Sequence, residues 1–359
     1  SVPYDSQRDV YMAMIDDLDA AMETLYTFAS AGDGILMRDF DISSFKGDSR
    51  LWVSFANTLK LRMAIRMSGV EPEARRIAEE AVRDMATYGL IDANAENLSF
   101  SSDSRQNPFY TQATSTSWQD LRSNASIVMY MNAYEDPRRA SYFSKSGYDG
   151  IYVGVRAGIQ NVTPTDYATY SYPLFAEKDP VPVMYASESW FLRAEGALLG
   201  WTMGDTAENL YNTGVKTSLE LWGNGSSYET YIASETAPAL SYADPRNKHN
   251  VSDFGTAVSV KWADDGNELE RIITQKWIAN HMIGHEAWAD VRRTGYPRLL
   301  QVVNNLSGGM WGNVDSSKGM RRLHYPQSEY DNNRENVLRG VELLGGSDLH
   351  GTDVWWAKK

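Results

Sequence analysis

The segment from Asp48 to Gly69 places the strongest constraint on the fold, because its apolar residues recur at helical spacing on two faces. One face carries Trp52, Phe55, Ala56, Leu59 and Met63, and the other carries Leu51, Thr58, Leu61 and Ile65. A helix that is apolar on two sides has to be covered on both of them. The chain is therefore predicted to fold as packed layers of helices.

This helix is predicted to be one arm of a hairpin. Pro72 is placed at the first turn of a following helix, which ends at Gly89. A similar pair runs from Met184 to Gly223 and turns at Gly204. Both pairs resemble tetratricopeptide hairpins, although the chain has no strict period of about 34 residues. Other predicted helices cover the ranges 6–29, 118–134, 226–235 and 266–283.

Long segments without helical periodicity separate the predicted helices, at 90–117, 138–182, 236–263 and 300–359. Segments of this length inside a compact domain usually carry function. The segment 138–182 is rich in tyrosine, and sugars are bound by aromatic faces together with planar polar groups. The candidate ligand-binding residues are Tyr148, Tyr152, Arg156, Tyr167, Tyr170, Tyr172 and Trp311. Each tyrosine could instead hold the loop onto the helical layer.

Composition excludes several classes of partner. The formal net charge is −13, with no basic cluster suited to a row of phosphates, so nucleic acid is excluded as a partner. The same charge disfavours direct adsorption to an anionic membrane. No apolar run is long enough for a transmembrane helix, and the absence of cysteine excludes disulfides and thiolate metal sites. Length alone allows two domains, but we expect residues 1–359 to form one.

A search for catalytic patterns favours a binding protein over an enzyme. The chain has no G-x-S-x-G, no Walker A loop and no G-x-G-x-x-G. His281 and His285 are four residues apart but lack the H-E-x-x-H glutamate, so we predict no metal site and no cofactor. Glu188 and Glu195 share a predicted helix face, where pairing with cations of neighbouring helices is favoured over glycoside hydrolysis.

Several stretches resemble one known family. ELERIITQKWIANHMIGHEAWADVRRTGYP, from Glu268 to Pro297, and MRRLHYPQSEYDNN, from Met320 to Asn333, are similar to the SusD/RagB family. Supporting stretches lie at 51–68, 133–138, 183–201 and 210–223, in the order that the family has them. The physical interpretation of the signature is structural. Gln275, Trp277, Trp288, Arg292 and Arg293 favour a buried seam of indoles and guanidinium groups, with Glu329 as a partner for one arginine.

The resemblance implies a mostly α-helical fold with tetratricopeptide-like hairpins and long irregular loops that form a ligand-binding face. It also implies a non-enzymatic, cell-surface glycan-binding protein of the outer membrane, which partners a TonB-dependent SusC-like channel. The hairpins would face the channel and the loops would bind oligosaccharide. Contact with the membrane would come through an N-terminal lipid anchor, which is absent from this chain together with the N-terminal part of the family fold.

Three alternatives remain open from the sequence. A RagB-like member would bind peptide, through donors and acceptors suited to an extended backbone. A protein-interaction scaffold would carry an exposed apolar patch on its hairpins and no ligand-sized pocket. A helical glycoside hydrolase would need two carboxylates that face each other across a cleft.

Overall fold

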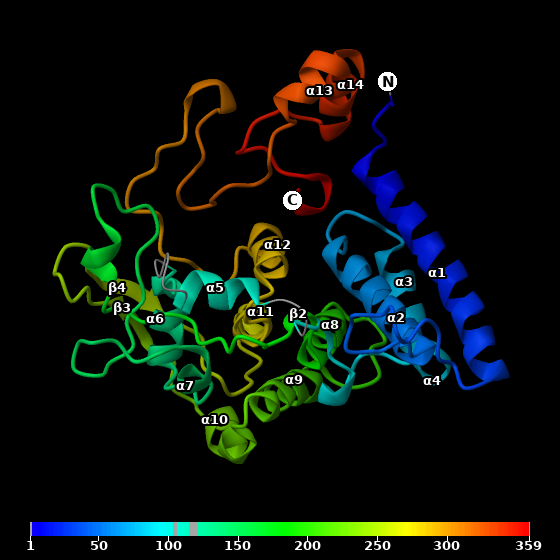
Figure 1. Ribbon diagram of the computed structural model, residues 1–359, viewed down its shortest axis with the longest axis horizontal. Helices are drawn as coiled ribbons and strands as arrows, with labels where there is room; N and C mark the ends of the chain where they lie inside the picture. The colour runs from blue at the N-terminus through cyan, green and yellow to red at the C-terminus, as the bar shows by residue number, and fades with distance from the viewer. Residues whose placement is uncertain (1, 103–105, 115–120, 359) are drawn as a thin grey trace.

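The computed structural model describes residues 2–102, 106–114 and 121–358, and these form a mostly α-helical protein (Figure 1). The first layer contains α1 (Gln7–Ala31), α2 (Ser49–Arg66), α3 (Ala74–Arg83) and α4 (Met85–Tyr88). Helix α1 begins where the Ser6 side chain accepts a hydrogen bond from the Asp9 amide, and Asp48 caps α2 in the same way. As its two apolar stripes require, α2 packs against α1, α3 and α8.

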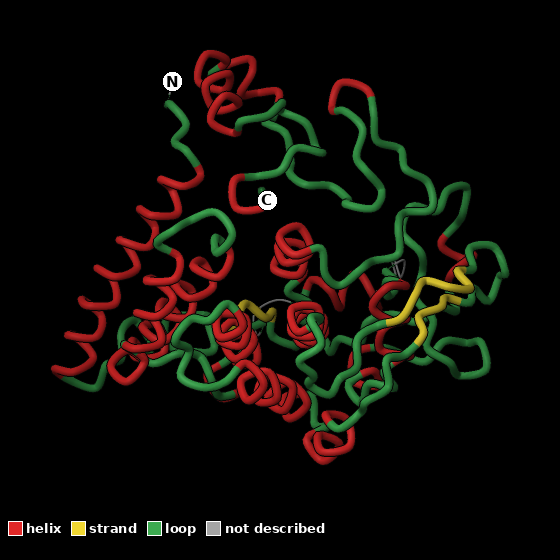
Figure 2. The backbone as a smooth tube through the Cα atoms, turned by 180° about the vertical axis from the view of Figure 1, so that it is seen from behind, coloured by secondary structure: helices red, strands yellow, loops and turns green. Residues whose placement is uncertain are grey.

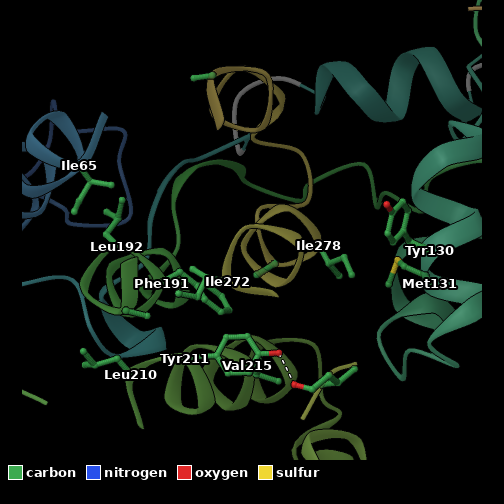
Figure 3. Packing of buried hydrophobic residues seen from close by; sticks show 14 of the residues in the cluster. Ile65, Tyr130, Met131, Phe191, Leu192, Leu210, Tyr211, Val215, Ile272 and Ile278 are labelled. Carbon is green, nitrogen blue, oxygen red and sulfur yellow. Dashed lines mark hydrogen bonds between the residues drawn. The ribbon is translucent and has the colours of Figure 1, made fainter. Parts of the chain in front are cut away.

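The second hairpin lies at the centre of the molecule. It pairs α8 (Ala186–Leu198) with α9 (Ala207–Leu221), and α11 (Glu268–Ala279) packs against both. Figure 3 shows how side chains of these helices interlock, with Phe191 and Tyr211 facing Ile272. Gly204, in the turn, has a φ of +86° that favours glycine. The predicted fold class and both hairpins are therefore confirmed.

The remaining elements surround this centre, and strands are few and short (Figure 2). Antiparallel pairs join β1 (Leu98–Phe100) to β2 (Val181–Met184) and β3 (Ala239–Tyr242) to β4 (Val251–Thr256). The other α-helices are α5 (Pro108–Thr114), α6 (Ala125–Ala133), α7 (Arg139–Tyr142), α10 (Tyr228–Ile232), α12 (Gly284–Thr294), α13 (Gln327–Asn332) and α14 (Arg334–Leu344). Short 3-10 helices cover Asn94–Glu96, Pro164–Tyr167, Gly225–Ser227, Gly309–Trp311 and Trp355–Ala357.

The two ends of the chain lie close together, because α13 and α14 approach the N-terminus (Figure 1). The Tyr4 hydroxyl donates a hydrogen bond of 2.6 Å to the Glu329 carboxylate. Nearby, the Asn333 side-chain amide donates to the Val2 carbonyl at 3.0 Å. The C-terminal 3-10 helix packs against α12. Contacts of this kind connect the last helices to the first layer.

Some predicted boundaries are wrong. Pro72 precedes the first turn of its helix, because α3 begins after Glu73. The helix predicted from residue 118 begins at Ala125, where the Asn124 side chain caps it, and residues 118–120 lie outside the described part. The helix predicted for 226–235 shrinks to α10 and a 3-10 turn. The segment 300–359 is not wholly irregular, since it contains α13 and α14.

Candidate functional site

The tyrosine-rich loop 138–182 is held in place by its own backbone and by the helical core. The Gly147 amide donates to the Thr169 carbonyl at 2.8 Å, and the Ser171 amide donates to the Val153 carbonyl at 3.0 Å. At its start, the buried Tyr142 donates to the Ile278 carbonyl of α11 at 3.0 Å. The loop therefore presents its side chains from a defined backbone.

Two of the predicted ligand contacts face the interior instead. Tyr167 is 6% exposed and Tyr170 is 1% exposed. The Tyr170 hydroxyl donates to the Asp244 carboxylate, and burial together with this hydrogen bond raises the pKa of Tyr170. Side chains this buried leave too little surface for a sugar ring to stack on. Tyr167 and Tyr170 therefore pack in the interior, and their burial argues against the prediction that they contact ligand directly.

A cavity of about 510 Å³ opens between the loop, α6 and β3. Tyr152 lines it and is half-buried. The Arg139 guanidinium lies 4.8 Å from the centroid of the Tyr152 ring and donates to the Asn132 side-chain oxygen at 2.9 Å. Asn132 in turn donates to the Tyr152 carbonyl at 2.9 Å. Lys145 also lines the cavity. Aromatic and polar groups thus converge on one ligand-sized space.

The other predicted loop residues lie outside this lining. Tyr148 packs edge-on against Tyr170, with the ring centroids 5.5 Å apart, and is half-buried. Tyr172 is half-buried as well. Arg156 donates to the His249 carbonyl at 3.2 Å and to the Gln301 carbonyl at 2.7 Å, and burial lowers its pKa. Of the six loop residues proposed from sequence, Tyr152 is the one that reaches the cavity.

Trp311 belongs to a separate cluster in the C-terminal third. Its ring stacks on His324 with the centroids 3.3 Å apart and the planes 18° apart. A hydrogen bond of 2.7 Å joins His324 Nδ1 to His350 Nε2. Trp311 is half-buried and lines neither of the two cavities described in this section. The structure therefore does not bring it together with Tyr152 in one pocket.

A second cavity, of about 550 Å³, lies beside α11. Trp262 and Glu270 line it, and burial raises the pKa of Glu270. Its cations are already paired, because Lys261 bonds the Glu235 carboxylate and Arg271 lies 3.1 Å from an oxygen of Asp265. The Arg271–Asp265 pair joins α11 to the residues just before it.

The carboxylates of α8 are structural rather than catalytic. Glu188 accepts two hydrogen bonds from Arg62 of α2, at 2.8 and 2.7 Å, and Lys276 lies 3.7 Å away. Glu195 accepts two bonds from Arg293 of α12. Burial alone would raise the pKa of Glu188, but Arg62 and Lys276 outweigh it and hold that pKa below its ordinary value. Each carboxylate is thus committed to a neighbouring helix, as predicted.

His281 is also structural. It is buried, its ring stacks on Tyr142 at a centroid distance of 4.0 Å, and burial lowers its pKa to about 3. His285 is largely exposed on α12. Within residues 2–102, 106–114 and 121–358, no group of three or more histidine, aspartate or glutamate side chains is arranged to hold a metal ion. The two histidines therefore do not form a site together.

The signature residues form a seam that is less buried than the sequence predicted, since Gln275 is buried whereas Trp277, Trp288, Arg292 and Arg293 are half-buried. Gln275 accepts a hydrogen bond from Arg138 at 2.9 Å. The Arg292 guanidinium lies 3.5 Å from the Trp288 ring centroid and 4.6 Å from that of Trp356. The predicted role of Glu329 is wrong. It accepts from Tyr4 and Asn333, whereas the seam arginines use backbone carbonyls, Glu195 and Asp290.

Comparison with known proteins places these features in a family. A family model described as "Susd and RagB outer membrane lipoprotein" matches residues 1–357. The chain belongs to the SusD/RagB family. By its description, this is a family of outer-membrane lipoproteins. Among the described residues, no helix combines the length and the apolar character that crossing a membrane requires.

Solved SusD homologues share the whole of this fold. A chitin-binding homologue from Flavobacterium johnsoniae is 39% identical, with a TM-score of 0.91, over 100% of this chain and 74% of its own. A homologue from Bacteroides uniformis is 40% identical, with a TM-score of 0.90 and the same coverage. One from Bacteroides thetaiotaomicron is 40% identical, with a TM-score of 0.89, again covering 74% of that chain. No functionally curated protein matches the chain significantly.

Sequence reasoning missed three cavity residues, Asn132, Arg139 and Lys145. Asn132 and Arg139 flank the stretch AYEDPR, from Ala133 to Arg138, which supported the resemblance to the SusD/RagB family. A useful signal was present there. Of the adjacent arginines Arg138 and Arg139, the first has a carboxylate partner in Asp136, two residues earlier. The second arginine is then available for another role.

Proposed function

We propose that the protein is a cell-surface glycan-binding member of the SusD/RagB family, which captures oligosaccharide for a TonB-dependent SusC-like channel and performs no catalysis. The observation that carries the proposal is the cavity at Tyr152, together with family membership. The family includes a solved chitin-binding homologue. The carboxylates that might have suggested hydrolysis, Glu188 and Glu195, are occupied by arginines in the helical core.

The cavity has the character that a sugar site needs. Its volume lies in the range of about 300–1,000 Å³ typical of ligand pockets. Tyr152 contributes an aromatic side chain, while Asn132 and Ser241 contribute polar groups suited to hydroxyls. Tyr148, Tyr172, Arg156 and Trp311 are kept as proposed contacts of a longer glycan beyond the cavity. We propose that the buried Tyr167 and Tyr170 stabilise the loop by packing beneath it, in the interior of the protein.

The proposal extends to location and partner, for which family membership is the support. We propose lipid attachment to the outer membrane, with the helical hairpins turned toward the channel and loop 138–182 toward the glycan. We also propose that residues 1–359 act as one domain, because Tyr4 near the start bonds Glu329 near the end. The loop and the hairpins then move as one body on the channel.

The test is a panel of neutral and acidic polysaccharides and oligosaccharides, measured by affinity electrophoresis and calorimetry, with chromatography of each mixture for products. Glycan binding without product formation is the expected result. Release of shorter products would refute the non-catalytic proposal. Binding of peptides and of no glycan would refute the proposed cargo.

The site is tested with single variants against the best-binding glycan. Tyr152→Ala should lower affinity about twofold to tenfold, because specific aromatic contacts contribute about 0.5–1.5 kcal/mol beyond the burial of their area. The matched control is Tyr26→Ala, which removes an exposed ring on α1 and should leave affinity unchanged. Equal affinities of Tyr152→Ala and the unchanged protein would show that the glycan binds elsewhere, and Trp311→Ala then tests the second aromatic cluster.

A further inference from the structure

Arg139 is held in place by neutral groups. Its guanidinium donates to the Asn132 side-chain oxygen at 2.9 Å and lies over the Tyr152 ring, 4.8 Å from the centroid. Asn132 is itself fixed by its 2.9 Å bond to the Tyr152 carbonyl. An amide and an aromatic face orient a cation without cancelling its charge. The guanidinium is therefore preorganised and still carries a full positive charge at the cavity.

The positive charges of the cavity are not neutralised by the other residues that line it. Among the described residues, none that lines it is an aspartate or a glutamate. Lys145 lines it too, and across the described ranges neither Lys145 nor Arg139 forms an ion pair. Neither cation of the cavity is therefore neutralised by a carboxylate of the described residues.

Other arginines near Arg139, and the second cavity, provide a contrast. The neighbouring Arg138 is fully buried and bonds Asp136 at 2.6 Å. In the second cavity Lys261 and Arg271 are each paired with a carboxylate, Glu235 and Asp265. Arg138 and the cations of the second cavity are thus neutralised by carboxylates, whereas those of the Tyr152 cavity have no carboxylate partner among the described residues.

We infer that this cavity selects a saccharide that bears an oxyanion, such as the carboxylate of a uronic acid or a sulfate ester. Arginine presents a planar fork of donors that matches such groups with two parallel hydrogen bonds. Because Arg139 covers a face of Tyr152, the ring acts first as the holder of the cation and second as a surface for the sugar. This inference rests on the proposed glycan-binding function and names its substrate class.

Net charge does not oppose this inference. Long-range repulsion by the acidic surface is screened beyond about 8–10 Å in physiological salt, whereas a contact inside the cavity is screened much less. The overall acidity should slow the approach of an acidic glycan at low salt, and Arg139 should determine how long it stays. Selectivity for the anion is therefore a property of the cavity.

The experiment compares each acidic glycan with its neutralised form on the same skeleton. Oligogalacturonides are measured beside their methyl esters by calorimetry. Chondroitin sulfate oligosaccharides are measured beside their desulfated forms, which keep the carboxylates, and beside their desulfated, carboxyl-esterified forms. The stepwise removal of sulfate and then of carboxylate separates the two groups. At least one acidic form should bind about tenfold to a hundredfold more tightly than its neutral counterpart, the range expected for a charge-assisted hydrogen bond.

Variants assign the preference to the cavity. Arg139→Gln should reduce the ratio between acidic and neutral forms to near one, while Arg139→Lys should keep part of it, since the charge remains and the fork is lost. Lys145→Gln changes an exposed side chain, so folding is not at risk, and should lower the ratio by a smaller factor. Arg339→Gln on α14 makes the same change in net charge outside the cavity and should leave the ratio unchanged.

The outcomes separate this inference from the proposed function. Equal binding of acidic and neutral forms, or an acidic preference that survives in Arg139→Gln, overturns the inference and leaves glycan capture standing. If only neutral glycans bind, and Tyr152→Ala weakens that binding, the inference is likewise overturned while glycan capture stands. If no glycan of either form binds, both the inference and the proposed function fail.

Discussion

Replacing Glu188 by glutamine should destabilise the protein more than the same replacement of an exposed glutamate. Glu188 is 0% exposed and accepts two hydrogen bonds from Arg62, itself 6% exposed. In Glu188→Gln the Arg62 guanidinium and the nearby Lys276 ammonium stay buried with one carboxylate fewer, because among the described residues Arg62 keeps only Glu286 at 3.7 Å and Lys276 keeps only Asp290 at 2.9 Å. Breaking a buried ion pair from one side costs about 3–5 kcal/mol.

This cost converts to a measurable shift in melting temperature. An unfolding entropy of about 2.1 cal/mol/K per residue near 60 °C gives about 0.75 kcal/mol/K for a chain of 359 residues. The expected fall in Tm is therefore about 4–7 °C. Because residues 1–359 are proposed to form one domain, the shift should move a single transition as a whole.

The effect of Glu188→Gln should also depend on pH, in a direction that can be predicted. The pKa of Glu188 is lowered in the folded state, so its stabilising contribution is present above the ordinary carboxylate pKa and is lost as pH falls through the folded value. The difference in Tm between the variant and the unchanged protein should shrink in acid. Scanning calorimetry at neutral pH and below pH 4 measures both effects. Glu335→Gln on α14, whose side chain is 81% exposed, is the control. A shift no larger than that of the control would refute the proposed cost of the buried pair.

Two further predictions concern residues of the tyrosine loop and its support. As pH falls below 6.5, the His281→Phe variant should lose less stability than the unchanged protein, because burial lowers the pKa of His281 to about 3 and only the unfolded state takes up the proton. In denaturant titrations, the difference in unfolding free energy should grow by up to about 1.4 kcal/mol per pH unit. Parallel stability curves for the two proteins would contradict this prediction. Tyr170→Phe should lower Tm by about 2–4 °C through loss of the bond to Asp244, with glycan affinity unchanged; a tenfold loss of affinity in calorimetry would make Tyr170 a ligand contact after all.

Helices and hairpins could be predicted because their signals are local. The double apolar stripe of α2, the Ser6 cap of α1 and the turn at Gly204 each depend on residues within a few positions of one another. Boundaries failed where a short polar side chain competed with the periodic pattern, as at Asn124, which begins α6 later than its apolar residues suggest. Helix α14 was missed because it lies in a segment rich in glycine and polar residues.

The candidate site could be predicted as a region but not as a set of residues. Aromatic content identified loop 138–182, yet sequence does not show which face of an irregular loop turns inward, so Tyr170 and Tyr152 could not be told apart. Arg139 was hidden for a related reason. Its proposed role depends on the absence of an acidic partner, and only the folded structure shows which side chains surround Arg139.

The residues that identify the family and the residues that are proposed to choose the cargo lie in different parts of the molecule. The signature builds the half-buried seam at Arg292 and Trp288, where the guanidinium lies over the indole and loss of either side chain is expected to lower stability. Arg139 and Lys145 are partly or fully exposed, so they can change with little effect on folding. Changes in the cavity are therefore expected to cost less stability than changes in the seam. A homologue that is 39% identical and binds chitin is then compatible with the proposed preference of this cavity for an acidic sugar.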